Sequence, residues 1–343
     1  MKNQTENPLV SIIVRTKDRP ILLKKALQSI AAQTYSPIEV VLVNDGDPLP
    51  DIEYYKVILN RFIFKCLDNH KGGRTKAANL GFYNSCGDFV CFFDDDDFLY
   101  NDHISSLVFF LQNSDYKIAY TDSRFVILEY DSSSERFIQV KSYLAPTMDF
   151  SRETLFFYNY IPFMCLMFHR DVINEVGVFD EEFELCEDWD LIIRISKTYP
   201  FYHIKKVTSE YNIWNRETQS ILNNERLFVF RKKIYQKHIS ELTPEIIANF
   251  IFNGYWINII FLEDKVSILE QESVNVKQEL VNVKNEYEAL AEKNRDIVEE
   301  NNIVKSENKL LFEKIISLEN HIRTNTIRFP KNIKKAFKFL LGR

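Results

Sequence analysis

The chain has 343 residues and a net charge of −6, and 45% of its residues are hydrophobic, so it can bury the core of one large domain with extensions or of two domains. Its first residues are polar and its apolar stretches stay short of the roughly 18 residues that a membrane span needs, so we expect neither a signal peptide nor a transmembrane helix. The five scattered cysteines indicate reduced thiols in a cytoplasmic protein rather than disulfides or a zinc site.

Residues 8 to about 215 alternate strand-like and helix-like segments. Apolar runs predict buried strands at 9–14, 38–43, 62–66 and 89–93. Residues with helical spacing predict a helix after Asp18 and Pro20, with Asp18 as its side-chain cap, and another after the glycines at 72 and 73. This order predicts an α/β fold with a largely parallel sheet covered on both faces. Residues 216–261 are expected to form a helical, aromatic-rich extension.

Four consecutive aspartates, Asp94 to Asp97, follow directly on the apolar run at 89–93. Carboxylates that lie so close together repel one another, and hard cations such as Mg²⁺ or Mn²⁺ take such oxygen ligands. A cation held by one or two carboxylates commonly also holds a phosphate. The alternative is a solvated acidic loop that caps the next helix.

Polar residues also follow the other predicted strands. Arg15 and Thr16 end the first strand, Asp45 follows the second, and the aspartates follow the fourth. Ligands of such sheets bind beyond the carboxyl ends of the strands, so these three clusters should meet in one crevice. A second acidic cluster, at 187–190, opens a predicted helix, where it either complements the helix dipole or supplies a general base.

The ordered set of motifs resembles the inverting glycosyltransferases of family 2, which have the nucleotide-sugar-binding GT-A fold. The matching segments cover about residues 8 to 215 and follow the order of the family: they are 10–20, 33–35, 39–46, 79–81, 87–97 and 187–191.

The resemblance implies a role for each matching position. Arg15 and Thr16 would line the nucleoside pocket, Asp45 would accept a hydrogen bond from the base, with uracil as the best fit, and Arg74 would lie near the base and diphosphate. Asp95 would contact the ribose or donor sugar, and Asp96, with Asp94 as a second ligand, would bind Mn²⁺ or Mg²⁺. Asp188 would be the catalytic base. The segment Tyr211–Ser220 resembles the part of the family that closes over donor and acceptor.

These residues suit one displacement reaction. The cation neutralises the leaving diphosphate, while Asp188 removes the proton of the acceptor hydroxyl as its oxygen attacks the anomeric carbon, which inverts the configuration. Two alternatives remain. A nucleotidyltransferase would attack phosphorus, but it usually needs a glycine-rich basic loop after the first strand, and residues 15–20 contain no glycine. A catalytically inactive transferase domain could serve as a scaffold.

Residues 262–322 show an unbroken heptad pattern. All nine d positions, spaced seven apart from Leu262 to Leu318, are apolar, and three successive a positions are Asn294, Asn301 and Asn308. Buried asparagines pair in parallel, in-register dimers, so the pattern predicts a long helix in a parallel homodimeric coiled coil. A single helix that folds back on the body of the protein is the alternative.

The last segment, residues 323–343, holds seven basic and no acidic residues. Its apolar residues after Pro330 share one helical face, which is typical of a helix that lies in a membrane interface. An acidic body with a basic tail argues against nucleic-acid binding. We therefore expect a cytoplasmic glycosyltransferase on the inner face of the membrane, with a glycan or lipid-linked acceptor in the synthesis of cell-surface polysaccharide. A protein partner for the tail is the alternative.

Overall fold

The computed structural model describes residues 7–131, 136–146, 148–214, 225–249, 251, 273–289 and 304–325. These residues fall into two compact units, Met1–Phe250 and Ile251–Arg343. Among the described helices, none is long and apolar enough to cross a membrane.

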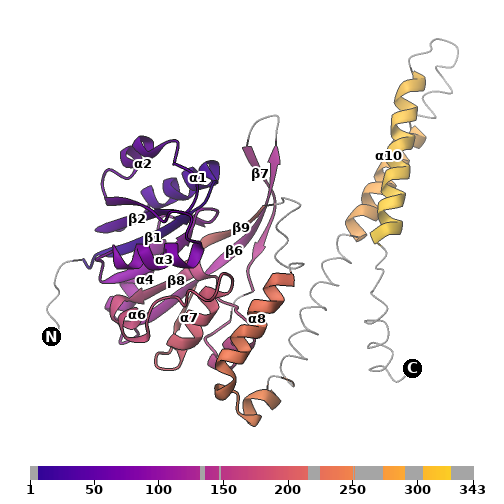
Figure 1. Cartoon of the computed structure of the whole chain (residues 1–343). Helices are drawn as coiled ribbons and strands as arrows, with labels where there is room; N and C mark the ends of the chain where they lie inside the picture. Colours follow the sequence, from indigo (N-terminus) through magenta and orange to yellow (C-terminus); the bar gives the residue numbers. More distant parts are fainter. Residues whose placement is uncertain are drawn as a thin grey trace. The chain divides into compact units, whose positions relative to one another are not determined.

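A mixed sheet forms the centre of the first unit (Figure 1). Four strands of its first half, in the order β3-β2-β1-β4, run parallel, and the other strands add antiparallel and parallel pairs. The strands are β1 (Val10–Thr16), β2 (Ile38–Asn44), β3 (Ile63–Asp68), β4 (Phe89–Asp94), β5 (Phe98–Leu99), β6 (Ile118–Asp131), β7 (Arg136–Leu144), β8 (Leu166–His169) and β9 (Tyr202–Trp214). The α/β fold with a mostly parallel sheet is therefore confirmed, and its antiparallel strands lie beyond β4.

Helices flank this sheet (Figure 1). Those of the first unit are α1 (Pro20–Ala31), α2 (Ile52–Ile58), α3 (Arg74–Tyr83), α4 (His103–Gln112), α5 (Arg152–Phe157), α6 (Arg170–Val176), α7 (Glu187–Ser196) and α8 (Glu225–His238), with 3-10 turns η1 (Phe163–Cys165) and η3 (Ile239–Glu241). α3 packs closely on β1, because a Cβ atom at Gly81 would lie 2.4 Å from Cγ2 of Ile13.

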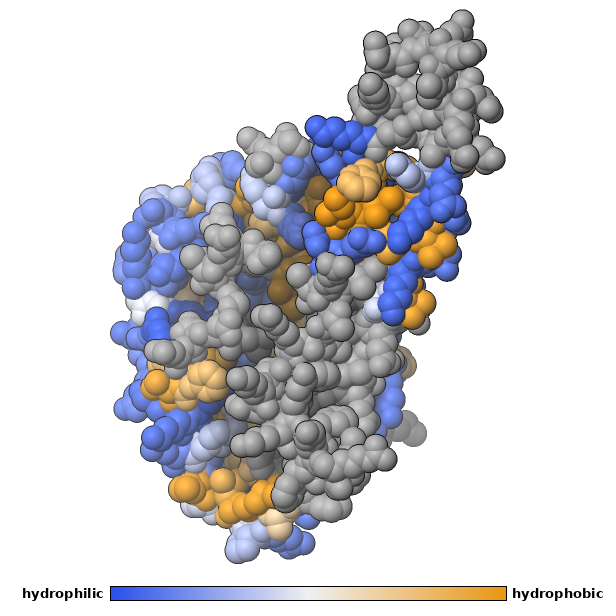
Figure 2. Space-filling view, turned by 90° about the vertical axis from the view of Figure 1, so that its right-hand side faces the viewer, coloured by the Kyte–Doolittle hydropathy of each residue, from blue (hydrophilic) through white to orange (hydrophobic). Residues whose placement is uncertain are grey.

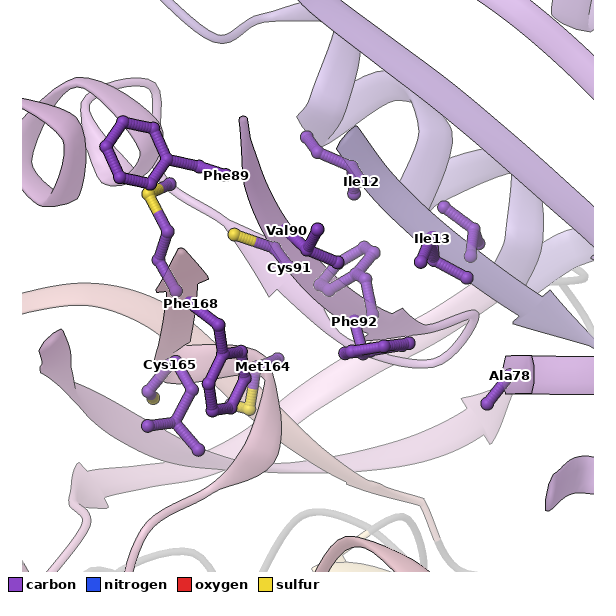
Figure 3. Close-up of a cluster of buried hydrophobic side chains, with 14 of the residues drawn as sticks. Ile12, Ile13, Ala78, Phe89, Val90, Cys91, Phe92, Met164, Cys165 and Phe168 are labelled. Carbon is purple, nitrogen blue, oxygen red and sulfur yellow. The ribbon is translucent and has the colours of Figure 1, made fainter. Parts of the chain in front are cut away.

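The core is built on the apolar strands that the sequence predicts. All seven residues of β1 and of β2 are buried, and so are the first five of β4. Figure 3 shows part of this cluster, in which Phe92 of β4 and Phe168 of β8 lie among apolar side chains from β1 and η1. Continuous apolar strands are expected where a sheet is covered on both faces.

One local prediction differs from the structure. α1 begins at Pro20 with Arg19 at its N-cap and no side-chain cap. Asp18 does not cap the helix: its Oδ1 atom accepts a hydrogen bond from the backbone N–H of Asp47 at 2.7 Å. Of the segment Tyr211–Ser220, Tyr211 to Trp214 belong to strand β9 and the remainder lies outside the described residues.

The second unit contains a helical segment at 273–289 and the helix α10 (Val304–Asn325). Nζ of Lys284 lies 3.5 Å from Oε1 of Glu319, so the two helices contact each other within one chain. The predicted helix of residues 262–322 is thus described only in these two parts, and Asn294 and Asn301 lie outside the described residues. Most of the basic tail, residues 326–343, lies outside them as well.

Candidate active site

Three neighbouring parallel strands deliver the predicted site residues to one edge of the sheet. Thr16 of β1 is paired with Asn44 of β2, and Arg15 is paired with Asp94 of β4. Asp45 follows β2 directly, and its backbone N–H donates to the carbonyl of Thr16 at 2.8 Å. The polar clusters that follow separate strands therefore meet, as the sequence predicts.

Arg15 and Arg74 connect β4 to α7. Nη2 of Arg15 lies 2.6 Å from Oδ1 of Asp94, and its Nη1 donates to Oε1 of Glu187 at 2.8 Å. Nε of Arg74 lies 2.8 Å from the same Glu187 oxygen, and its Nη2 lies 3.3 Å from Oδ2 of Asp94. Burial alone would raise the pKa of Asp94, but the two guanidinium groups hold it below its ordinary value. The four side chains form a charge-balanced bridge.

Asp95 is fully buried and held by two partners from the start of the chain. Oγ1 of Thr16 donates to its Oδ2 at 2.6 Å, and the guanidinium of Arg19 pairs with both of its oxygens. Burial raises the pKa of Asp95 to about 7, and the neighbouring charge of Asp96 acts in the same direction.

Asp96 is the more exposed of these two neighbours, with 21% of its side chain accessible. Nη1 of Arg19 lies 2.6 Å from its Oδ2, and Nδ2 of Asn212 donates to its backbone carbonyl at 2.7 Å. The next residue, Asp97, is buried and accepts a hydrogen bond from the backbone N–H of Asn212 at 3.3 Å. Burial, together with the charges of Asp96 and Asp94, raises the pKa of Asp97 well above its ordinary value.

Asp188 lies in the first turn of α7, next to Glu187. Its Oδ1 accepts a hydrogen bond from the backbone N–H of Trp189 at 2.8 Å, and its Oδ2 accepts one from Nδ2 of Asn159 at 3.2 Å. Burial, aided by the charge of Glu187, raises the pKa of Asp188 to about 6. A carboxylate with a pKa just below neutrality can both lose and accept a proton at physiological pH.

Asp190, a further acid of this helix, has a structural role. Its Oδ2 accepts from Nε of Arg194 at 2.8 Å, and its Oδ1 lies 2.9 Å from Nε2 of His238 and 2.8 Å from Nζ of Lys237. Despite its burial, these partners keep the pKa of Asp190 below its ordinary value. Asp190 therefore fastens α8 to α7, whereas Asp188 faces the bridge of charges.

Asp45 is buried at the end of β2 and is connected to the start of α3. Its Oδ1 accepts hydrogen bonds from Nδ2 of Asn69 at 2.6 Å and from the backbone N–H of Gly73 at 2.9 Å. Its Oδ2 lies 3.8 Å from Nζ of Lys17. This arrangement places Asp45 beside Arg74, the first residue of α3.

Two residues of the site carry no role in the sequence prediction. Arg19 binds Asp95 and Asp96, and Glu187 holds both Arg15 and Arg74. The sequence contains a feature that could have indicated each of them: Arg19 is a basic residue shortly after the first strand, and Glu187 directly precedes the predicted base. Sequence alone does not show which acid pairs with which base.

Among the residues that the structure describes, no group of three or more His, Cys, Asp or Glu side chains is arranged to hold a metal ion. The carboxylates at the end of β4 are nevertheless the oxygen donors that a hard cation prefers. Magnesium in particular is commonly bound through one or two carboxylates, with water and substrate phosphate completing its coordination.

Comparison with known proteins identifies the first unit. Residues 11–177 match the model of glycosyl transferase family 2. These residues form a family 2 glycosyltransferase domain. The matched segment contains most of β1 and all of β2 and β4, with Arg15, Asp45 and Asp94 at their ends, whereas Asp188 lies beyond it.

Relatives of the glycosyltransferase domain are found in bacteria. The chain is 28% identical to the uncharacterized glycosyltransferase YwdF of Bacillus subtilis over 191 residues, which covers 55% of this chain and 69% of that protein. It is 24% identical to the uncharacterized glycosyltransferase RT0329 of Rickettsia typhi over 231 residues, which covers 66% of this chain and 70% of the relative.

A solved structure shares the fold of the glycosyltransferase domain. The crystal structure of S. aureus TarS in complex with UDP-GlcNAc matches with a TM-score of 0.52 and 18% identity, and the match covers 71% of each chain. At this identity the likeness shows the GT-A fold that the sequence predicts.

Proposed function

We propose that the domain transfers a sugar from a nucleotide-sugar, with a UDP-sugar as the best fit, to a hydroxyl group of a glycan acceptor with inversion at the anomeric carbon. One observation carries the proposal: the bridge of Arg15, Arg74 and Glu187 holds Asp188 next to the acidic end of β4. A base and a cation-binding group are thereby placed at one site, although they are far apart in the sequence.

Asp188 is the proposed catalytic base. Its pKa of about 6 leaves the carboxylate ionised at neutral pH. Such a carboxylate can take the proton of an acceptor hydroxyl as that oxygen attacks the sugar. The hydrogen bonds from Asn159 and from the backbone of Trp189 fix the orientation of this carboxylate.

The donor would bind over the ends of β1, β2 and β4. Asp96, with Asp94 as the second candidate, would hold Mn²⁺ or Mg²⁺, and the bound cation would neutralise charge on the departing diphosphate. Asp94 already binds two guanidinium groups, which favours Asp96 as the ligand. Arg15 and Arg74 supply positive charge beside the phosphates.

The remaining predicted residues would recognise the nucleoside. Thr16 and Asp95 are hydrogen-bonded to each other and would lie at the ribose. Asp45 would accept a hydrogen bond from the base, and a carboxylate fits the imide N–H of uracil. Each of these roles is the one that the family resemblance implies for a residue at this edge of the sheet.

The acceptor and the location of the enzyme follow from the rest of the chain. We propose a lipid-linked glycan in the synthesis of cell-surface polysaccharide, reached from the cytoplasmic face of the membrane through the basic tail 323–343. Each basic residue near an anionic leaflet adds ~1 kcal/mol to binding. Sedimentation of the full chain with vesicles of phosphatidylglycerol and phosphatidylcholine at low salt tests this, with a chain truncated after residue 322 as the control.

An isosteric substitution of the base tests the reaction. Asp188→Asn should lower the rate of sugar transfer by about 10²–10⁴ because it removes general-base catalysis, while the dissociation constant of UDP stays near that of the wild type. Glu182→Asn, at an exposed residue of the loop before α7, is the control. Full activity of Asp188→Asn would contradict the proposed mechanism. Lack of transfer and of hydrolysis by the wild type with every common nucleotide-sugar would favour an inactive scaffold.

A further inference from the structure

A row of aromatic rings crosses three strands that extend from the body of the first unit, where β6 and β7 form a long hairpin beside β9 (Figure 1). Phe125 of β6 is paired with Tyr143 of β7 on one side and with Tyr211 of β9 on the other. The ring centre of Phe125 lies 5.6 Å from that of Tyr143 and 5.5 Å from that of Tyr211. Paired residues of neighbouring strands lie on the same face of a sheet. The three rings therefore form one continuous row, here called the aromatic row.

One end of the aromatic row lies at the candidate active site. Asn212, the residue after Tyr211, donates hydrogen bonds to the backbone carbonyl of Asp96 at 2.7 Å and to Oδ1 of Asp97 at 3.3 Å. Burial raises the pKa of the Tyr211 hydroxyl, and the charges of Asp97, Asp96, Asp94 and Asp188 raise it further. Tyr211 is thus next to the residue that contacts the acidic end of β4.

The other end of the row is accessible to solvent. Tyr143 lies on β7, which pairs with β6 at the margin of the sheet, and 41% of its side chain is exposed. The opposite face of β6 is the interior one, since Val126 and Leu128 are only 2% and 9% exposed. The row therefore runs from Tyr211, which packs against the core, to Tyr143 at the surface.

From this geometry we infer that the aromatic row binds the acceptor, with successive pyranose rings of a glycan packed against Tyr211, Phe125 and Tyr143. This inference rests on the proposed function. A pyranose ring presents an apolar C–H face and a rim of hydroxyl groups, and the negative face of an aromatic ring attracts such C–H groups. Because the row continues away from Asp188, it suits an oligosaccharide whose terminal hydroxyl reaches the base.

The hairpin of β6 and β7 could instead contact a second copy of the chain, since β7 has other exposed apolar residues such as Ile138 and Val140. The glycan is favoured because the row is continuous with the site and because aromatic rings, rather than aliphatic side chains, make that continuation. A protein contact would require no connection to Tyr211.

The test compares acceptors of different length. Methyl glycosides and tetrasaccharides of glucose, mannose, galactose and N-acetylglucosamine are screened with the full chain, and the best pair is used to measure KM. The tetrasaccharide should bind more tightly than the methyl glycoside. Tyr143→Ala should raise KM for the tetrasaccharide about fivefold, while Tyr143→Phe, which keeps the ring, should stay within about twofold of the wild type.

A matched control comes from the same hairpin. Tyr130 is 46% exposed and pairs with Phe137, on the opposite face of β6 from Phe125. Tyr130→Ala should leave KM for both acceptors at the wild-type value.

Three results would overturn the inference. If the wild type transfers sugar with the same KM for both acceptors, or if Tyr143→Ala has the same KM for the tetrasaccharide as the wild type, the row does not bind the acceptor. The proposed function stands in either case. If Tyr143→Ala changes the oligomeric state in sedimentation but leaves KM unaltered, the hairpin of β6 and β7 makes a protein contact instead. Absence of transfer to every acceptor removes the proposed function and the acceptor row together.

Discussion

The carboxylate of Glu187 accepts a hydrogen bond from Nη1 of Arg15 at 2.8 Å, although 172 positions separate the two residues in the chain. The same oxygen of Glu187 lies 2.8 Å from Nε of Arg74. Glu187 and Arg15 are 1% and 7% exposed, so their contact is shielded from water, whereas Arg74 is 46% exposed. Because Asp188 is the next residue, this contact sets the position of the proposed base relative to the donor side of the site.

Loss of the charge of Glu187 should therefore affect both stability and activity. Glu187→Gln should lower the free energy of unfolding by about 3 kcal/mol, because it leaves two guanidinium groups with Asp94 as their remaining acid in this bridge. Urea denaturation followed by circular dichroism measures the effect. The control is Glu184→Gln, since Glu184 is 69% exposed and pairs with Arg226 on the surface, where a lost ion pair costs at most about 1 kcal/mol. Equal effects of the two substitutions would contradict the structural role of Glu187.

The sequence predicts the location of this site better than its internal contacts. Apolar strands that end in polar residues indicate which edge of a parallel sheet carries the ligand, and this rule brings Arg15, Asp45 and Asp94 together correctly. It does not indicate that Arg19 binds Asp95, because ion-pair partners depend on side-chain directions after folding. Asp18 shows the same limit: a residue typical of a helix cap binds the backbone of Asp47 instead.

The sequence also does not indicate the strands beyond β4, because neither their hydrophobic pattern nor their pairing is local. β7 exposes apolar residues on both faces, so it lacks the alternation that marks a half-buried strand. β6 and β9 pair along ten residues although more than 80 positions separate them, and no local pattern encodes that pairing.

The raised pKa of Asp188 predicts the pH dependence of transfer. The base must be deprotonated to accept the hydroxyl proton, and its pKa is about 6. At saturating donor, kcat/KM for the acceptor should fall about tenfold for each pH unit below 6 and should level off above it. The dissociation constant of UDP measured over the same pH range separates this effect from titration of Asp95. A rate that is constant from pH 5 to 8 would exclude Asp188 as the titrating base.

The acidic end of β4 provides a matched pair of variants for the metal. Treatment with EDTA should abolish transfer, and Mn²⁺ or Mg²⁺ should restore it. Asp96→Asn should raise the Mn²⁺ concentration for half-maximal rate about tenfold or more. Asp97→Asn should change it little, because Asp97 is buried and the amide oxygen can still accept the hydrogen bond from Asn212.

Binding of Mn²⁺ to each variant in the presence of UDP, followed by electron paramagnetic resonance, provides a measurement independent of the rate. Full activity in EDTA, or equal shifts in the two variants, would contradict the role of Asp96 as a metal ligand.

The described surface exposes some large apolar side chains. On the face shown in Figure 2, the described residues are mainly hydrophilic and the hydrophobic ones gather in separate patches. α10 contributes to the exposed apolar surface through Leu310, Phe312 and Ile316, which are 70%, 54% and 43% exposed. Large exposed apolar groups of this kind are typical of surfaces that bind a partner.

The last prediction concerns the arrangement of the second unit. The heptad pattern predicts a parallel dimer, in which Val283, at a d position, would face Val283 of the second chain. In the described residues, Val283 is buried and the neighbouring Lys284 contacts Glu319 of the same chain. The two arrangements bring different pairs of residues together.

If the parallel dimer forms, Val283→Cys should give a covalent dimer on mild oxidation, visible by non-reducing electrophoresis. If the chain folds back on itself, a carbodiimide should instead join the amine of Lys284 to the carboxylate of Glu319 by an amide bond within one chain, which mass spectrometry of the linked peptides identifies. Sedimentation at micromolar concentration should then report a dimer or a monomer, respectively. We expect the dimer, because an unbroken heptad pattern with in-register asparagines favours pairing between two identical helices, and an exclusively intrachain bond in a monomeric protein would show this expectation to be wrong.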